Sequence, residues 1–203
     1  MFALHRMLLK QSLSKTSWFN KHPLFRHRQV TKSVWHLEEK YFDSWNLANL
    51  FLVQGSKCDL LVDTGIGLHD LPNYLLWSKL REDRDKPLKV ALTHSHFDHS
   101  GGAHQFQNVT ICNRSRDDDR KNHLFTFQLP GVEGIYVHAE EIEVLRKASK
   151  YLSASWIEPN EVWPKPDGWK ARDYNIKPVS GGLLYALNEN DKFDLGDKTI
   201  EAR

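Results

Sequence analysis

One segment near the middle of the chain constrains the fold more than any other feature. Residues 87–93, PLKVALT, form a short apolar run, which is typical of a strand buried on both faces. The run leads directly into HSHFDHSGG, which contains four side chains that can bind a metal ion: His94, His96, Asp98 and His99. Because open α/β sheets usually bind their ligands at the carboxyl ends of strands, we expect a functional site here.

The spacing of these four side chains favours a metal site. Imidazole and carboxylate are ligands that zinc takes in catalytic sites. His94 and His96 are two residues apart where a strand ends, so in an extended segment their rings point the same way and one metal can take both. Asp98 and His99 follow on the next turn and can reach a neighbouring position. The alternative, a polar His-rich loop, does not explain an alternation of ligands that ends in Gly101 and Gly102, which would let the backbone turn tightly.

The pattern of the remaining chain predicts a mixed α/β layer protein. Residues 50–53 and 59–62 are two β-runs joined by a turn, which indicates a hairpin. A helix is expected over residues 70–83, where Asp70 and Pro72 lie near the start. An amphipathic helix is expected over residues 139–152, and the chain after it returns to β-structure with turns at residues 188–191 and 196–197.

Composition excludes several classes of protein. The balance of 28 basic against 26 acidic residues, a formal net charge of +2, gives no support for a nucleic-acid partner. No apolar run approaches the roughly 20 residues that cross a bilayer. The 2 cysteines do not form a disulfide framework and fit a reducing compartment. We therefore expect an intracellular protein, cytoplasmic or mitochondrial.

The motif of residues 93–102, THSHFDHSGG, resembles the H-x-H-x-D-H signature of the metallo-β-lactamase superfamily. LLVDTG at residues 60–65 is similar to the superfamily's aspartate motif at the end of an early strand, and VDTGIGLHDLPNYL and VHAEE resemble its acyl-CoA thioesterase branch. The resemblance runs from about residue 34 to residue 203. It implies an αββα sandwich whose first half is present and whose second half is incomplete.

The resemblance also implies roles for individual residues. His94 and His96 would bind a first zinc ion, and Asp98 and His99 a second. Asp63 would hold the ligand loop in place without binding metal. Two zinc ions would acidify a bridging water for attack on a thioester carbonyl, and Asp98 would also be the catalytic group that orients this water and takes its proton. The expected substrate is a small molecule, an acyl-CoA; hydrolysis of glutathione thioesters, lactams or nucleic acid is the alternative.

The sequence departs from the superfamily pattern in two respects, and it also has a basic N-terminal segment. Residues 1–33 contain no acidic residue and are expected to be a basic extension, disordered or targeting to mitochondria. The metallo-β-lactamase domain is expected over residues 34–203, with an insertion at about residues 110–134. The later zinc ligands of the superfamily have no counterpart in the sequence, so we expect an incomplete domain that retains zinc poorly, with an inactive fragment as the alternative.

Overall fold

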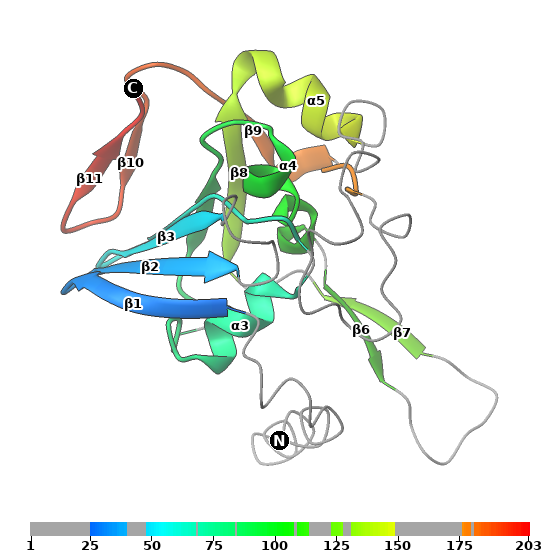
Figure 1. Cartoon of the computed structure of the whole chain (residues 1–203), viewed down its shortest axis with the longest axis horizontal. Helices are drawn as coiled ribbons and strands as arrows, with labels where there is room; N and C mark the ends of the chain where they lie inside the picture. Colours follow the sequence, from blue (N-terminus) through cyan, green and yellow to red (C-terminus); the bar gives the residue numbers. More distant parts are fainter. Residues whose placement is uncertain are drawn as a thin grey trace.

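A seven-stranded mixed sheet forms the centre of the computed structural model, with strand order β1-β2-β3-β4-β5-β8-β9 (Figure 1). The strands are β1 Phe25–Thr31, β2 Val34–Glu39, β3 Asn49–Gln54, β4 Asp59–Val62, β5 Leu88–Ala91, β8 Val132–His138 and β9 Leu184–Leu187. The structure describes residues 25–39, 48–67, 69–83, 85–107, 131–148, 176–179 and 181–203, and the backbone alone of residues 109–113 and 123–127.

The direction of the strands brings several loops to one edge of the sheet. Strands β1 to β4 form an antiparallel meander, whereas β4, β5, β8 and β9 run parallel. Parallel neighbours need a crossover, and helix α3 (Leu71–Trp77) lies in the connection from β4 to β5. The carboxyl ends of β4 and β5 therefore lie side by side, and the segments that leave them meet.

The main hydrophobic core lies on the face of the sheet that the helices cover. Leu75 of α3 and Leu145 of α5 (Ile142–Arg146) both belong to it. Leu61 of β4 faces the same core, whereas its neighbour Leu60 faces the opposite side, because successive residues of a strand point to opposite faces. Strand β5 is likewise buried on both faces, with Val90 in the main core and Ala91 on the opposite side, as the apolar run at residues 87–93 predicts.

A short hairpin covers part of the opposite face. Its strands are β10 (Lys192–Asp194) and β11 (Thr199–Glu201), which pair antiparallel. Phe193 and Leu195 pack with Val53 and Leu60 in a second, smaller core. The described residues thus form a helical layer, a large sheet and a two-stranded piece on the far side, which confirms an α/β sandwich with one half more complete than the other.

Most elements expected from the sequence are present. The hairpin of residues 50–62 is β3–β4, and α3 begins as expected because the Asp70 side chain accepts a hydrogen bond from the Asn73 backbone N–H at 3.1 Å. The helix expected over residues 139–152 is shorter within the described residues, where a 3-10 turn, η2 (Ala139–Glu141), precedes α5. Residues 149–152 lie outside the described residues.

The central sheet includes residues that precede the expected start of the domain. Strand β1 lies within the segment expected to be a basic extension, and Phe25 is buried in the main core. The remaining residues of β1 are exposed, since this strand lies at the edge of the sheet, where charged side chains are tolerated. The sheet therefore begins at Phe25 and not at residue 34. Residues 1–24 lie outside the described residues.

The segment expected to be an insertion is partly β-structure. Strands β6 (Val109–Asn113) and β7 (His123–Phe127) pair antiparallel in a separate two-stranded sheet. Residues 132–134 belong to β8 of the central sheet, so this segment ends earlier than expected. Residues 114–122, the charged stretch between β6 and β7, lie outside the described residues. None of the helices that the structure describes is long and apolar enough to cross a membrane.

Candidate functional site

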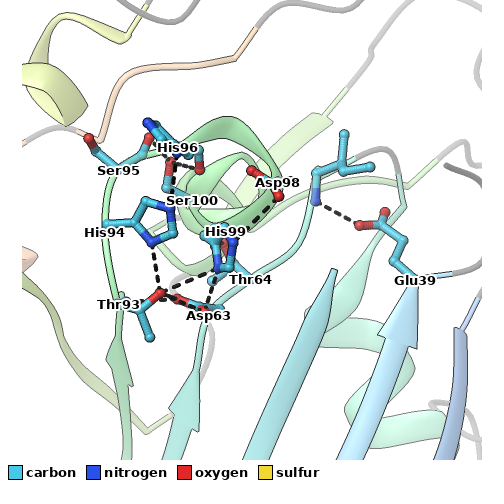
Figure 2. Close-up of polar contacts among 11 residues, drawn as sticks. Glu39, Asp63, Thr64, Thr93, His94, Ser95, His96, Asp98, His99 and Ser100 are labelled. Atoms are coloured by element: carbon cyan, nitrogen blue, oxygen red, sulfur yellow. Dashed lines mark hydrogen bonds and ion pairs between the residues drawn. The ribbon is translucent and has the colours of Figure 1, made fainter. Parts of the chain in front are cut away.

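The residues expected to bind metal lie at the edge where β4 and β5 end (Figure 2). Strand β5 stops at Ala91, and the segment after it carries His94 and His96. Asp98 and His99 lie on a single helical turn, α4 (Phe97–Ser100). The sequence-based expectation that these side chains follow one buried strand agrees with this arrangement.

His94 and His96 form a pair with the spacing of two ligands of one ion. Nε2 of His94 lies 3.1 Å from Nδ1 of His96. Two nitrogens bound to one tetrahedral zinc at about 2.0–2.1 Å lie roughly 3.3 Å apart, so the pair is close to that geometry. The other ring nitrogen of His94, Nδ1, lies 3.1 Å from Oγ1 of Thr93, which directs Nε2 toward His96.

Asp98 and His99 form a second pair of the same kind. Oδ2 of Asp98 lies 3.4 Å from Nε2 of His99, again the separation of two ligands on one zinc. The His94 and His99 rings lie 4.1 Å apart between centroids, so the two pairs are neighbours. Among the residues that the structure describes, no group of three or more His, Cys, Asp or Glu side chains could hold a metal ion. Within the described residues, each pair therefore offers an ion two ligands and no third.

Asp63 lies beneath both pairs and is buried, with 4 % of its surface exposed. Its carboxylate accepts hydrogen bonds from the Thr93 backbone N–H at 2.8 Å and from the Thr93 hydroxyl at 2.9 Å. Oδ2 also lies 2.8 Å from Nδ1 of His99. An ionised carboxylate can only accept, so the proton of neutral His99 sits on Nδ1 and the lone pair of Nε2 faces Asp98.

The backbone of Asp63 has a left-handed conformation with φ of 62°. Such a conformation is uncommon outside glycine, although Asp and Asn adopt it more readily than other residues. It turns the chain sharply at the end of β4, where the Asp63 N–H donates to the Ala91 carbonyl at 2.9 Å. The turn aims the carboxylate at Thr93 and His99.

The surroundings shift the pKa values of two of the histidines in opposite directions. The hydrogen bond to Asp63 raises the pKa of His99 above its usual value, although desolvation opposes it. Burial lowers the pKa of His94, and the neighbouring His99 and His96 rings lower it further. His94 is therefore neutral at neutral pH, and a neutral imidazole is the form that binds a metal.

Gly101 and Gly102 serve a different purpose from the one expected. Their φ angles are −58° and −84°, which any residue adopts. A Cβ on Gly101 would collide with the Ile66 carbonyl oxygen, and a Cβ on Gly102 would lie 2.5 Å from the Thr64 carbonyl oxygen. The glycines are needed because the segments after β4 and after α4 pack backbone against backbone.

Sequence reasoning missed other polar side chains at the site. Glu39 is fully buried, and its Oε2 accepts a hydrogen bond from the Ile66 backbone N–H at 2.7 Å. Ser95 donates a hydrogen bond to Glu141 at 3.1 Å, and Ser100 donates to the Ser95 carbonyl at 2.7 Å. Glu39 and Ile66, and likewise Ser95 and Glu141, are far apart in the sequence, so no local spacing reveals these two contacts.

Comparison with known proteins agrees with this fold and motif. Residues 43–183 match the family described as Metallo-beta-lactamase superfamily, and the chain belongs to this superfamily. Within it, the chain is 32 % identical over 184 residues to the acyl-coenzyme A thioesterase MBLAC2 of Homo sapiens, covering 87 % of this chain and 56 % of the relative. The same protein of Gallus gallus is 32 % identical over 182 residues, covering 87 % and 55 %. The chain thus spans about half the length of these curated relatives.

Solved structures support the fold alone. The chain is similar to MEM-A1, a subclass B3 metallo-β-lactamase from a soil metagenome library, with a TM-score of 0.51 at 16 % identity, covering 88 % of this chain and 52 % of that one. It is also similar to BJP-1, a subclass B3 metallo-β-lactamase of Bradyrhizobium japonicum, with a TM-score of 0.50 at 15 % identity, covering 86 % and 50 %. The metallo-β-lactamase fold expected from the sequence is confirmed.

Proposed function

We propose that this chain provides zinc ligands of a hydrolase that cleaves acyl-CoA thioesters. The observation that supports this most strongly is the pair of ligand-like contacts, His94 with His96 and Asp98 with His99, side by side at the end of a buried strand. Membership of the superfamily and the names of the curated relatives support the reaction and its substrate.

The two pairs would hold two zinc ions. Zinc bound here would supply a Lewis acid that acidifies a water molecule and polarises the thioester carbonyl. Asp63 would fix the tautomer of His99 through Nδ1 and keep Nε2 free as a ligand. The low pKa of His94 would keep that ring unprotonated and ready to bind.

Asp98 would have a second role as the base. Its side chain is 13 % exposed, so the carboxylate borders solvent from which water can enter. The carboxylate would accept a hydrogen bond from the attacking water and then its proton. The departing thiolate is a good leaving group, so the reaction does not require a strong general acid.

The composition supports an intracellular setting for this activity, in the cytoplasm or in mitochondria. Cys58, one of the 2 cysteines, is a buried free thiol. Buried thiols are common in reducing compartments, where disulfides are rare. Targeting to mitochondria would depend on the acid-free residues that precede β1.

The proposal is tested by measuring hydrolysis of long-chain and short-chain acyl-CoA, a glutathione thioester, a β-lactam and RNA by the purified chain with added zinc. We expect hydrolysis of acyl-CoA that EDTA abolishes and zinc restores, and its loss in His94→Ala. Hydrolysis of a different substrate alone would favour another reaction of the superfamily. Turnover that neither EDTA nor His94→Ala affects would refute the metal-dependent mechanism.

A further inference from the structure

We propose that Glu141 is a positioning residue for the His94–His96 pair and that it acts through the hydroxyl of Ser95. This inference rests on the proposed function, in which the pair binds metal. Glu141 ends the 3-10 turn η2, which follows β8, the parallel neighbour of β5. It therefore reaches the site from a different strand than the two histidines.

Ser95 lies between the two histidines and is held from both sides. Its hydroxyl donates a hydrogen bond to Oε1 of Glu141 at 3.1 Å, and its carbonyl accepts one from the Ser100 hydroxyl at 2.7 Å. Ser95 is 6 % exposed and Ser100 is 2 % exposed, so water competes little for these hydrogen bonds. Ser95 is thereby fixed between η2 on one side and α4 on the other (Figure 2 shows the α4 side).

The contact between Ser95 and Glu141 lies beyond the last backbone hydrogen bond that joins the segment after β5 to β8. The Leu92 backbone N–H donates to the Tyr136 carbonyl at 2.8 Å, which extends the pairing of β5 with β8 by one residue. The next backbone N–H, that of Thr93, turns to Asp63. At Ser95, the hydrogen bond from its hydroxyl to Glu141 connects this segment to the chain that follows β8. A displacement of Ser95 would move His94 and His96 together.

The carboxylate of Glu141 is kept in an unfavourable setting. Its second oxygen, Oε2, is buried and has no hydrogen-bond partner among the residues that the structure describes. A buried polar atom without a partner destabilises the fold. Its neighbour Glu140 is exposed by contrast. A half-satisfied carboxylate beside a candidate site is typical of a residue that serves the site more than stability.

Metal binding by the 203-residue chain tests this role, with Co²⁺ alone as the probe. Glu141→Ala and Ser95→Ala should each weaken Co²⁺ binding about 10-fold, as loss of a supporting contact does in metal sites. The double variant should bind no more weakly than either single one, because both remove the same hydrogen bond. Glu141→Gln keeps an oxygen that accepts from Ser95 and should bind as the wild type does. Glu140→Ala, a matched change one residue away, should also have no effect.

A second measurement separates this role from the proposed function. Nuclear magnetic resonance of the imidazole nitrogens, recorded without metal, should show that Glu141→Ala shifts the His94 and His96 signals. The His99 signals should stay in place, since Asp63 holds that ring. If the wild type binds no Co²⁺, the proposed metal function is wrong, and the imidazole signals still decide the role of Glu141. Two results would overturn the positioning role of Glu141. One is unchanged His94 and His96 signals in Glu141→Ala, and the other is a Co²⁺ affinity of Glu141→Ala equal to that of Glu140→Ala.

Discussion

Asp63 offers the sharpest test of how the site is held together, because its carboxylate and its backbone can be perturbed separately. Asp63→Gly removes the carboxylate but tolerates the φ of 62°. Asp63→Ala removes the same carboxylate and also places a Cβ in a left-handed conformation. Asp63→Asn keeps a side chain that tolerates this conformation and can still accept from Thr93, but it lacks the charge that faces His99.

The contacts give the size of each effect. Removal of the carboxylate leaves three donors without their acceptor, the Thr93 N–H, the Thr93 hydroxyl and the His99 Nδ1–H, all within 2.8–2.9 Å of it. At about 1 kcal/mol for each donor, Asp63→Gly should lower the free energy of unfolding by about 3 kcal/mol. Asp63→Ala should lose on the order of 1 kcal/mol more. Asp63→Asn should lose roughly 1–2 kcal/mol, the difference between a charged and a neutral hydrogen bond.

Urea unfolding monitored by tryptophan fluorescence measures these differences. The expected order of stability is wild type, Asn, Gly and then Ala. A Gly variant as stable as the wild type would show that the carboxylate contributes nothing. An Ala variant as stable as the Gly variant would show that the left-handed backbone imposes no strain on a side chain. Either result would refute the corresponding part of the reasoning.

Two further predictions concern packing and pH. Gly101→Ala should destabilise the fold by at least about 2 kcal/mol, because the new Cβ meets the Ile66 and Phe97 carbonyl oxygens. Gly182→Ala is the control and should be close to neutral, because nothing lies within 4 Å of the added Cβ. Equal stability of the two variants in thermal unfolding would contradict this prediction. Burial lowers the pKa of His69 to about 4, while the unfolded chain has a value of about 6.5. The unfolded state therefore binds the extra proton below pH 6.5, and stability should fall by about 2 kcal/mol between pH 7.5 and pH 5 through this residue. His69→Phe should flatten that part of the pH profile of urea unfolding, and an unchanged slope would rule out this contribution.

The sequence predicts those site residues that lie within a few positions of one another along the chain. His94 and His96 lie on one extended stretch, and Asp98 and His99 share one helical turn, so their spacing alone places them together. Asp63 is distant from these residues in the sequence, and it was predicted to lie near them only because LLVDTG resembles the superfamily's aspartate motif. Its function as the holder of the ligand loop stays a prediction.

The residues that sequence reasoning missed depend on contacts between distant segments. Glu39 is separated from its partner Ile66 by 27 residues, and Glu141 is separated from Ser95 by 46. No periodic pattern marks such pairs, because they form only when the sheet brings the strand ends together. Strand β1 was missed for a related reason. Every residue of it after Phe25 is exposed, so it lacks the alternation of buried and exposed residues that reveals a strand.

The most direct test of the metal site is anomalous diffraction at the zinc absorption edge from crystals of the chain grown with zinc. We expect one peak between Nε2 of His94 and Nδ1 of His96, and a second between Oδ2 of Asp98 and Nε2 of His99. With two described ligands for each ion, both peaks should weaken after dialysis against metal-free buffer. Zinc bound elsewhere, or no peak within bonding distance of either pair, would contradict the assignment of these four side chains as ligands.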